Sequence, residues 1–216
     1  PFLKEVDSLA LANAQIHLQN AYKNFFEGRA AFPKFKSKKH KQSYTTNMVN
    51  GNIKIEAGHI KLPKFKKPMK MKQHREIPAD HKIKSCTISK TKTGKYYISI
   101  LTEYEKDIRP VKIQKVVGLD FAMDGLYVDS EQGEKANYPR YYRQALDKLA
   151  KAQRILSRRK KGSTRWEKQR LKVAKLHEKI ANQRRNFLHH KSKELAANYD
   201  AVIIEDLDMK GMSQAL

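Results

Sequence analysis

The chain has 216 residues, and its 46 lysines and arginines against 22 aspartates and glutamates give a formal net charge of +24 at pH 7. No window approaches the ~18 consecutive apolar residues of a membrane span, and the first residues do not form a signal peptide, so we expect a cytoplasmic, nucleoid-associated protein of a prokaryote. A charge of this size favours nucleic acid as the partner over an anionic membrane surface, and we expect no membrane partner.

The first predicted element is an amphipathic helix over residues 3–26, because apolar residues recur there at a mostly helical spacing and Gly28 can end it. Residue 1 is not methionine, so we expect the numbering to begin inside a longer protein. Residues 32–41 then alternate aromatic side chains with lysines, and Pro33 excludes a helix interior. Such a segment can stack on bases while its lysines contact phosphates, although an ordinary basic linker fits it nearly as well.

Residues 43–104 carry turn signals at Asn50-Gly51, Ala57-Gly58 and Thr93-Gly94 between short alternating runs. These runs predict strands near residues 44–48, 52–56, 59–62, 83–90 and 95–103. Several short antiparallel strands without helices favour a small β-barrel or a curled sheet.

Two expectations concern single side chains of these strands. Cys86 is the only cysteine, which excludes an internal disulfide and any zinc site built from several cysteines within these residues. We expect it to be a small core residue, with a reactive thiol as the alternative. Of Tyr96 and Tyr97, the alternation predicts that one faces the core and the other the surface.

Residues 107–110 are the expected linker to a second unit. There, strands are predicted at residues 116–121, 125–128 and weakly near 137–138. A helical hairpin follows over about residues 141–198, broken near residues 158–163, where Ser163 or Thr164 can cap the second arm. That arm spans roughly 50 Å, so we expect it to project and to present its basic face. A last strand covers residues 201–205.

Asp120 and Glu205 each follow a short apolar run. Such runs predict strands buried on both faces, and functional groups collect at the carboxyl edge of sheets with parallel strands. Carboxylates from two neighbouring strands can bridge Mg²⁺ or Mn²⁺ ions ~4 Å apart, as phosphodiester hydrolysis requires. We therefore expect these two acids to lie side by side, although each alone fits a helix cap or a salt bridge, and Asp124 and Asp129 fit turn positions.

Positive charge is concentrated in two tracts that are depleted in acids. Residues 33–75 contain 13 lysines and arginines against Glu56, and residues 148–193 contain 17 against Glu167 and Glu178. A solvated helix face explains one such tract. Two tracts with so few acids would be destabilised by repulsion among their own positive charges unless a polyanion such as nucleic acid neutralised them. The predicted nucleic-acid contacts are Lys34, Lys36, Lys38, Lys39, Lys41, Lys64, Lys66, Lys67, Arg158, Arg159, Lys160, Lys161, Arg165, Lys168, Arg170, Arg184 and Arg185.

Several motifs in combination resemble one known family. They are VGLDF at residues 117–121, RRKKGS at 158–163, IANQRRNFLH at 180–189, IEDL at 204–207 and MKGM at 209–212. Together they are similar to the transposon-encoded TnpB/OrfB nucleases, the apparent ancestors of the compact type V CRISPR effectors. The likeness runs from about residue 32 to residue 216.

This resemblance implies a mixed α+β chain with three parts: a recognition-like helix (residues 1–31), a basic wedge-like barrel (32–110) and an incomplete RNase H-like domain of RuvC type (111–216) that contains the hairpin. It implies an RNA-guided, Mg²⁺-dependent or Mn²⁺-dependent DNA endonuclease of transposition, with guide RNA and target DNA as partners. Asp120 matches the first RuvC acid and Glu205 the second.

The family continues past Leu216 into a third acid and a zinc ribbon, so zinc is expected only in that missing part. Because the third acid is missing, the sequence leaves open whether residues 1–216 alone cleave DNA. The sequence also leaves the oligomeric state open. Two alternatives therefore remain. One is a catalytically incomplete nucleic-acid-binding protein or regulator of transposition, and the other is a ribosome-associated basic protein, for which Asp120 has no use.

Overall fold

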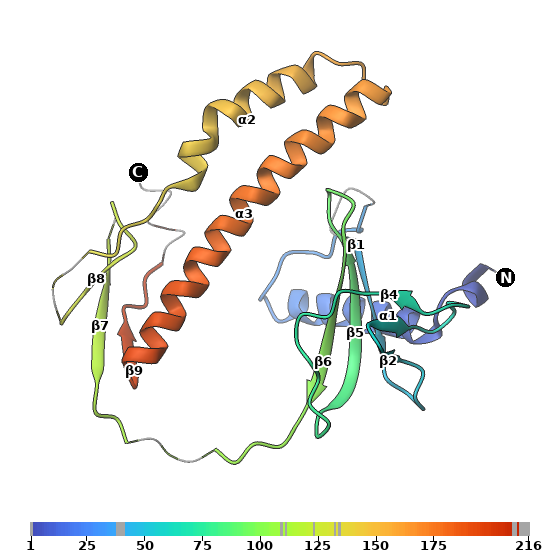
Figure 1. Cartoon of the computed structure of the whole chain (residues 1–216), viewed down its shortest axis with the longest axis horizontal. Helices are drawn as coiled ribbons and strands as arrows, with labels where there is room; N and C mark the ends of the chain where they lie inside the picture. Colours follow the sequence, from blue (N-terminus) through green and yellow to red (C-terminus); the bar gives the residue numbers. More distant parts are fainter. Residues whose placement is uncertain are drawn as a thin grey trace. The chain divides into compact units, whose positions relative to one another are not determined.

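A computed structural model describes residues 2–37, 42–108, 110, 112–122, 124–131, 133, 135–208 and 211, and all statements below concern these residues. The chain divides into two compact units, Pro1–Asp107 and Ile108–Leu216. The described chain combines helices with short strands (Figure 1), which confirms the mixed class predicted from the sequence. None of the described helices combines the length and the apolar character needed to cross a membrane.

The first unit contains two separate antiparallel sheets, with the strand orders β1-β5-β6 and β2-β3-β4. The predicted barrel is wrong, because these described strands form open sheets that do not close on each other. The strands β2 to β4 are only two or three residues long, too short to continue the pairing of the longer sheet around a barrel. The elements are η1 (Phe2–Glu5), α1 (Ser8–Phe26), β1 (Gln42–Asn47), β2 (Lys54–Glu56), β3 (His59–Lys61), β4 (Met69–Lys70), β5 (Lys82–Lys90) and β6 (Tyr96–Glu103).

One apolar core joins the two sheets of the first unit. Its buried members are Ile53, Ile60, Leu62 and Cys86, and partly buried side chains of both sheets pack against them. Burial raises the pKa of the Cys86 thiol to about 11. Cys86 is therefore the core residue that was predicted, because a thiol with this pKa stays protonated and unreactive near neutral pH.

The Ile60→Ala variant should lower the free energy of unfolding by about 2–5 kcal/mol, because its side chain is 0% exposed and its removal leaves a cavity. Urea unfolding followed by circular dichroism measures this loss. The matched control is Ile113→Ala, whose side chain is 63% exposed, with an expected change within about 0.5 kcal/mol. Equal effects of the two variants would contradict this assignment of the core.

The prediction for Tyr96 and Tyr97 is wrong, since their side chains are 66% and 47% exposed. Tyr96 is the first residue of β6 and pairs with Lys90, the last residue of β5. The Lys90 ammonium lies 5.4 Å from the centroid of the Tyr96 ring. The alternation along β6 holds, but the core ends before this end of the sheet.

Helix α1 begins at Ser8 and not at Leu3, which belongs to the short helix η1. Asp7 is the reason, because its carboxylate accepts a hydrogen bond from the Leu9 amide (3.2 Å) at the first turn of α1. The same carboxylate accepts a second hydrogen bond from the Thr46 hydroxyl of β1. Asp7 therefore sets both the start of the helix and its attachment to the sheet.

The contacts of α1 with β1 are also polar. The Asn13 side-chain amide donates to the Thr45 carbonyl (3.1 Å) and to the Asn47 side-chain oxygen (3.3 Å). Within the described chain, α1 contains no buried residue, and Ile16 and Leu18 are about half exposed. The apolar residues of α1 nearest this attachment, Leu9, Ala10 and Leu11, are half-buried and not fully buried.

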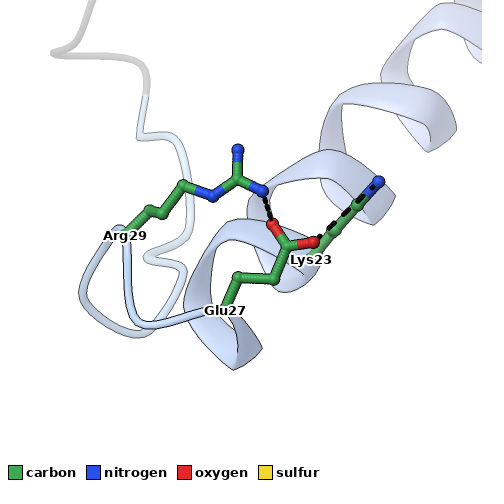
Figure 2. A network of polar contacts seen from close by, with 3 residues as sticks. All are labelled: Lys23, Glu27 and Arg29. Atoms are coloured by element: carbon green, nitrogen blue, oxygen red, sulfur yellow. Dashed lines mark hydrogen bonds and ion pairs between the residues drawn. The ribbon is translucent and has the colours of Figure 1, made fainter.

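A small polar network closes the carboxyl end of α1 (Figure 2). The Glu27 carboxylate forms ion pairs with Arg29 and with Lys23, whose ammonium lies 4.0 Å away. Gly28 adopts a φ of +70°, and the Arg29 amide donates to the Asn24 carbonyl (2.8 Å). These contacts turn the chain back along the helix and so direct the basic segment that follows.

The second unit combines a three-stranded sheet with a helical hairpin (Figure 1). The strand order is β8-β7-β9, with β7 and β9 parallel and β7 and β8 antiparallel. The weak strand predicted near residues 137–138 is absent from the described chain, where Lys135 alone forms a bridge with Val128. The elements are β7 (Val116–Phe121), β8 (Tyr127–Asp129), α2 (Tyr141–Ser157), α3 (Thr164–Asn198) and β9 (Ala201–Ile204).

The sequence predicts that the strands of this sheet are buried on both faces, and this prediction is wrong. Val117 of β7 is fully buried, but the β9 side chains Val202, Ile203 and Ile204 are 40%, 63% and 70% exposed. In the described chain β9 is an edge strand, so it lacks neighbours on one side, and no second layer covers these side chains.

The helical hairpin has its own core, formed by Leu149 and Ala152 of α2 with Val173 and Ile180 of α3. Gln169 is buried and donates to the Ala152 carbonyl (2.9 Å), so its amide is satisfied inside this interface. Leu146 and Gln153 of α2 lie outside this core and are exposed. The Ser163 hydroxyl accepts a hydrogen bond from the Trp166 amide (3.2 Å), which confirms the predicted cap.

Candidate functional site

Two strands that are distant in the sequence bring Asp120 and Glu205 to the same edge of a sheet. In the parallel pair of β7 and β9, Gly118 lies opposite Ile203 and Leu119 opposite Ile204. Asp120 of β7 and Glu205, the first residue after β9, directly follow this last pair, and paired strands lie about 4.8 Å apart. Both acids therefore lie at the carboxyl edge of the β7–β9 pair.

Both acids line an open depression of about 400 Å³. Each is exposed, so each can reach a ligand from solvent. The hydroxyl of Ser130 accepts a hydrogen bond from the Gly118 amide, and the Ser130 amide donates to the Gly118 carbonyl, both at 2.9 Å. These bonds hold the end of β8 beside β7. The residues that line the depression are Gly118, Leu119, Asp120, Val128, Asp129, Ser130, Ile203, Ile204 and Glu205.

Asp129 is a residue that the sequence interpretation placed in a turn. It is instead the last residue of β8, it is half-buried, and it lines the same depression as the two acids. It pairs with Leu119, and Val128 pairs with Asp120, so Asp129 belongs to the opposite face of the sheet from Asp120. Its position at the end of the short apolar run of β8 was the signal that could have identified it.

The other acids near this sheet have structural partners. Asp124 forms an ion pair with Lys135, which lowers the pKa of the Asp124 carboxyl, and it lies in the predicted turn. The Asp208 carboxylate accepts a hydrogen bond from the Gly211 amide (3.0 Å). Neither acid lines the depression that Asp120 and Glu205 share.

The donor set of the depression suits a hard divalent cation. Mg²⁺ is bound in proteins by one or two carboxylates, with water and substrate phosphates completing its shell, so Asp120 and Glu205 are sufficient ligands by type. In the described part of the chain, no group of three or more histidine, cysteine, aspartate or glutamate side chains is arranged to hold a metal ion. The two acids therefore fit a cation whose remaining ligands are oxygens from elsewhere.

A second candidate surface is a groove of about 520 Å³ in the first unit. The Phe32 ring contacts the rings of Tyr22 (5.8 Å between centroids) and Phe25 (5.3 Å), which holds the basic segment against α1. Phe35 is fully exposed, so one face of its ring is free to stack on a base. The groove is lined by α1 residues, by Phe32, Pro33, Lys34, Phe35 and Lys36, and by Ser43, Tyr44 and Thr45 of β1.

The predicted nucleic-acid contacts are exposed in the described chain, except Arg159, which is half-buried. Lys38, Lys39 and Lys41 lie outside the described residues. Three of these predicted residues also interact within the protein. The Lys64 ammonium donates to the Lys4 carbonyl (2.9 Å), and the Arg159 guanidinium donates to the Arg165 carbonyl. Arg170 forms an ion pair with Glu167 (2.7 Å). Exposed interactions of this kind contribute about 0–1 kcal/mol, so a phosphate can displace them.

Comparison with known proteins gives consistent matches. Residues 99–216 match the family OrfB_IS605, described as "Probable transposase". The chain is 34% identical over 211 residues to a "Putative RNA-guided DNA endonuclease" of Streptomyces pristinaespiralis, covering 98% of the chain and 52% of that protein. It is 35% identical over 216 residues to the "Putative RNA-guided DNA endonuclease InsQ" of Escherichia coli strain K12, covering 99% and 52%. The chain thus spans about half the length of these curated relatives.

Proposed function

Because the chain belongs to the OrfB_IS605 family of probable transposases, we propose that it is part of a transposon-associated, RNA-guided DNA endonuclease with a RuvC-type, Mg²⁺-dependent site. Two similar proteins carry the name RNA-guided DNA endonuclease. The observation that supports the proposal is the parallel pairing of β7 with β9, since Asp120 and Glu205 directly follow its last paired residues, Leu119 and Ile204. We further propose that the protein acts in the cytoplasm on nucleoid DNA.

In this proposal the carboxylates of Asp120 and Glu205 hold the divalent ions. When bound, two such ions activate a water molecule and stabilise the leaving oxygen of a phosphodiester. The carboxylates fix the position of this charge at the rim of an open depression, where a nucleic-acid strand can approach. The third acid expected from the family resemblance would complete the ligand set from beyond Leu216.

The basic surfaces would bind guide RNA and target DNA. Exposed arginines and lysines lie at the turn between α2 and α3 and along α3, where a strand can pass with its phosphates neutralised. In the first unit, Lys34 and Lys36 flank Phe35, so phosphate contacts and base stacking are available side by side. We propose the single-stranded or unpaired part of a nucleic acid as the ligand of Phe35.

The test is metal removal from the intact protein loaded with its RNA. We expect cleavage of DNA that matches the guide in Mg²⁺, none in excess chelator, and full recovery when Mg²⁺ is added back, because the carboxylates alone cannot activate water. A guide mismatched to the DNA is the control and should give no product in Mg²⁺. Cleavage in chelator, or cleavage with the mismatched guide, would refute the proposal.

A nucleic-acid-binding protein without catalysis is the second candidate. It is favoured by the exposed lysines and arginines of residues 34–36 and of the helical hairpin, which can bind phosphates without a metal ion. It predicts that the intact protein binds the same RNA and DNA and leaves the DNA uncut in Mg²⁺.

A further inference from the structure

The parallel register of β9 is weakly determined by its own side chains. β9 has four residues and lies at the edge of its sheet, and the side chains of Ile203 and Ile204 are 63% and 70% exposed within the described chain. Register is strongly specified where one face of a strand is buried and weakly specified where it is not. Something other than apolar burial must therefore fix which residue of β9 lies opposite which residue of β7.

A hydrogen-bonded clamp at the start of both strands supplies this constraint. One carboxylate oxygen of Asp200, Oδ2, accepts from the amides of Gln114 (3.1 Å) and Lys115 (2.9 Å). In return, the Lys115 carbonyl accepts from the amides of Asp200 (2.9 Å) and Ala201 (3.3 Å). Four hydrogen bonds therefore join two residues on each side across a sequence separation of 85 or 86.

The clamp is also tied to the helical hairpin and to β8. Tyr199 is the C-cap residue directly after α3, and its amide donates to the Leu195 carbonyl (3.0 Å). Its hydroxyl donates to the Glu131 carboxylate beyond β8, and the Lys115 ammonium lies 5.3 Å from the centroid of its ring. The backbone bonds to Lys115 and Gln114 also lower the pKa of the Asp200 carboxyl, so it stays ionised as an acceptor near neutral pH.

We propose that Asp200 is a positioning residue, which locks β9 in register with β7 and thereby aligns Glu205 with Asp120. This inference rests on the proposed nuclease site. Asp200 lies at the amino end of β9 and Glu205 directly after its carboxyl end, so the clamp sets the position of Glu205 through four paired residues. Asp200 itself lies outside the depression that the two acids line.

A slip of one residue shows why the register matters. It would displace Glu205 by about 3.3 Å along the strand and turn its side chain to the other face of the sheet. Ions in a two-metal site lie only about 4 Å apart, so a displaced Glu205 could no longer share them with Asp120. Alignment of the strands is thus a condition for the site and not only for stability.

The experiment compares Asp200→Ala with Asp200→Asn in the intact, RNA-loaded protein. Alanine removes the acceptor, whereas the asparagine oxygen can still accept from both amides. We expect Asp200→Ala to lower kcat for DNA cleavage by about 10–100-fold with DNA affinity unchanged, as for residues that orient metal ligands. We expect Asp200→Asn to stay within about threefold of the parent, on the same principle.

A second readout does not depend on activity. Hydrogen exchange of the amides of residues 201–204 should become faster in Asp200→Ala and remain slow in Asp200→Asn, because only alanine opens the clamp. Leu149→Ala in the hairpin core is the control for general destabilisation, since it should lower the melting temperature and leave these amides protected.

The outcomes separate the two proposals. Parent-like kcat together with parent-like exchange in Asp200→Ala would overturn the clamp. So would an equal loss in Asp200→Asn or in Leu149→Ala, since neither removes the acceptor. If the parent protein does not cleave DNA at all, the proposed function fails, while the exchange rates still decide whether Asp200 fixes the register.

Discussion

Replacing Asp120 with alanine in the intact protein is expected to lower guide-directed DNA cleavage by about 10³-fold or more. The reason is that an ion bound by this carboxylate contributes several kcal/mol to the stabilisation of the transition state, and each 1.4 kcal/mol is about tenfold in rate. Glu205→Ala should give a loss of the same order, because both acids serve one site. Rates are measured in single turnover with DNA matched to the guide.

The matched control for this experiment is Asp124→Ala. Asp124 lies three residues after Phe121 in the same unit, is exposed, and forms an ion pair with Lys135 outside the depression. Its removal should change the rate by about twofold at most, as for an ordinary surface substitution. Unchanged cleavage in Asp120→Ala, with RNA and DNA binding intact, would remove the nuclease site proposed at this sheet edge.

Affinity for nucleic acid is expected to fall steeply with salt. We assume that the basic surfaces neutralise six to ten phosphates. A plot of log(1/Kd) against the logarithm of salt concentration should then have a slope of roughly −5 to −9. Affinity would then decrease by about 10³-fold to 10⁵-fold between about 50 and 200 mM salt. Filter binding of structured RNA, single strands and duplex over a salt series measures the slope for each ligand.

Variants show which lysines contribute to this slope. Lys160→Gln with Lys161→Gln should make the slope less negative by about two, one for each lost phosphate contact. The control pair is Lys92→Gln with Lys106→Gln, two exposed lysines outside the predicted contacts, which removes the same charge. An equal change in both pairs would mean that total charge and not the hairpin turn determines affinity. A flat salt dependence would exclude both the nuclease and the non-catalytic binder.

Local interactions explain which predictions the sequence supported well. The helical hairpin was recognisable in part from the cap at Ser163, which acts within three residues, and its core of Leu149, Val173 and Ile180 joins two helices adjacent in the sequence. The acid pair was recognisable for a related reason, since Asp120 and Glu205 each end a short apolar run. The family resemblance rests on the same local motifs.

Contacts between distant residues decided the rest. Whether strands close into a barrel depends on hydrogen bonding between whole strands, so the predicted barrel was wrong although all five of its predicted strands exist. The start of α1 depends on Asp7, whose carboxylate accepts hydrogen bonds from the Leu9 amide of the helix and from the Thr46 hydroxyl of β1. The exposure of the β9 side chains depends on the position of β9 at the edge of its sheet.

The sequence by itself therefore determined the hairpin, the character of the basic surfaces and the identity of two candidate metal ligands. Only the tertiary structure decided that these two acids line one depression, because parallel pairing of β7 with β9 and the hydrogen bonds from Gln114 and Lys115 to Asp200 join segments about 85 residues apart. Periodicity along the chain carries no information about such a register, which is set by backbone hydrogen bonds between strands.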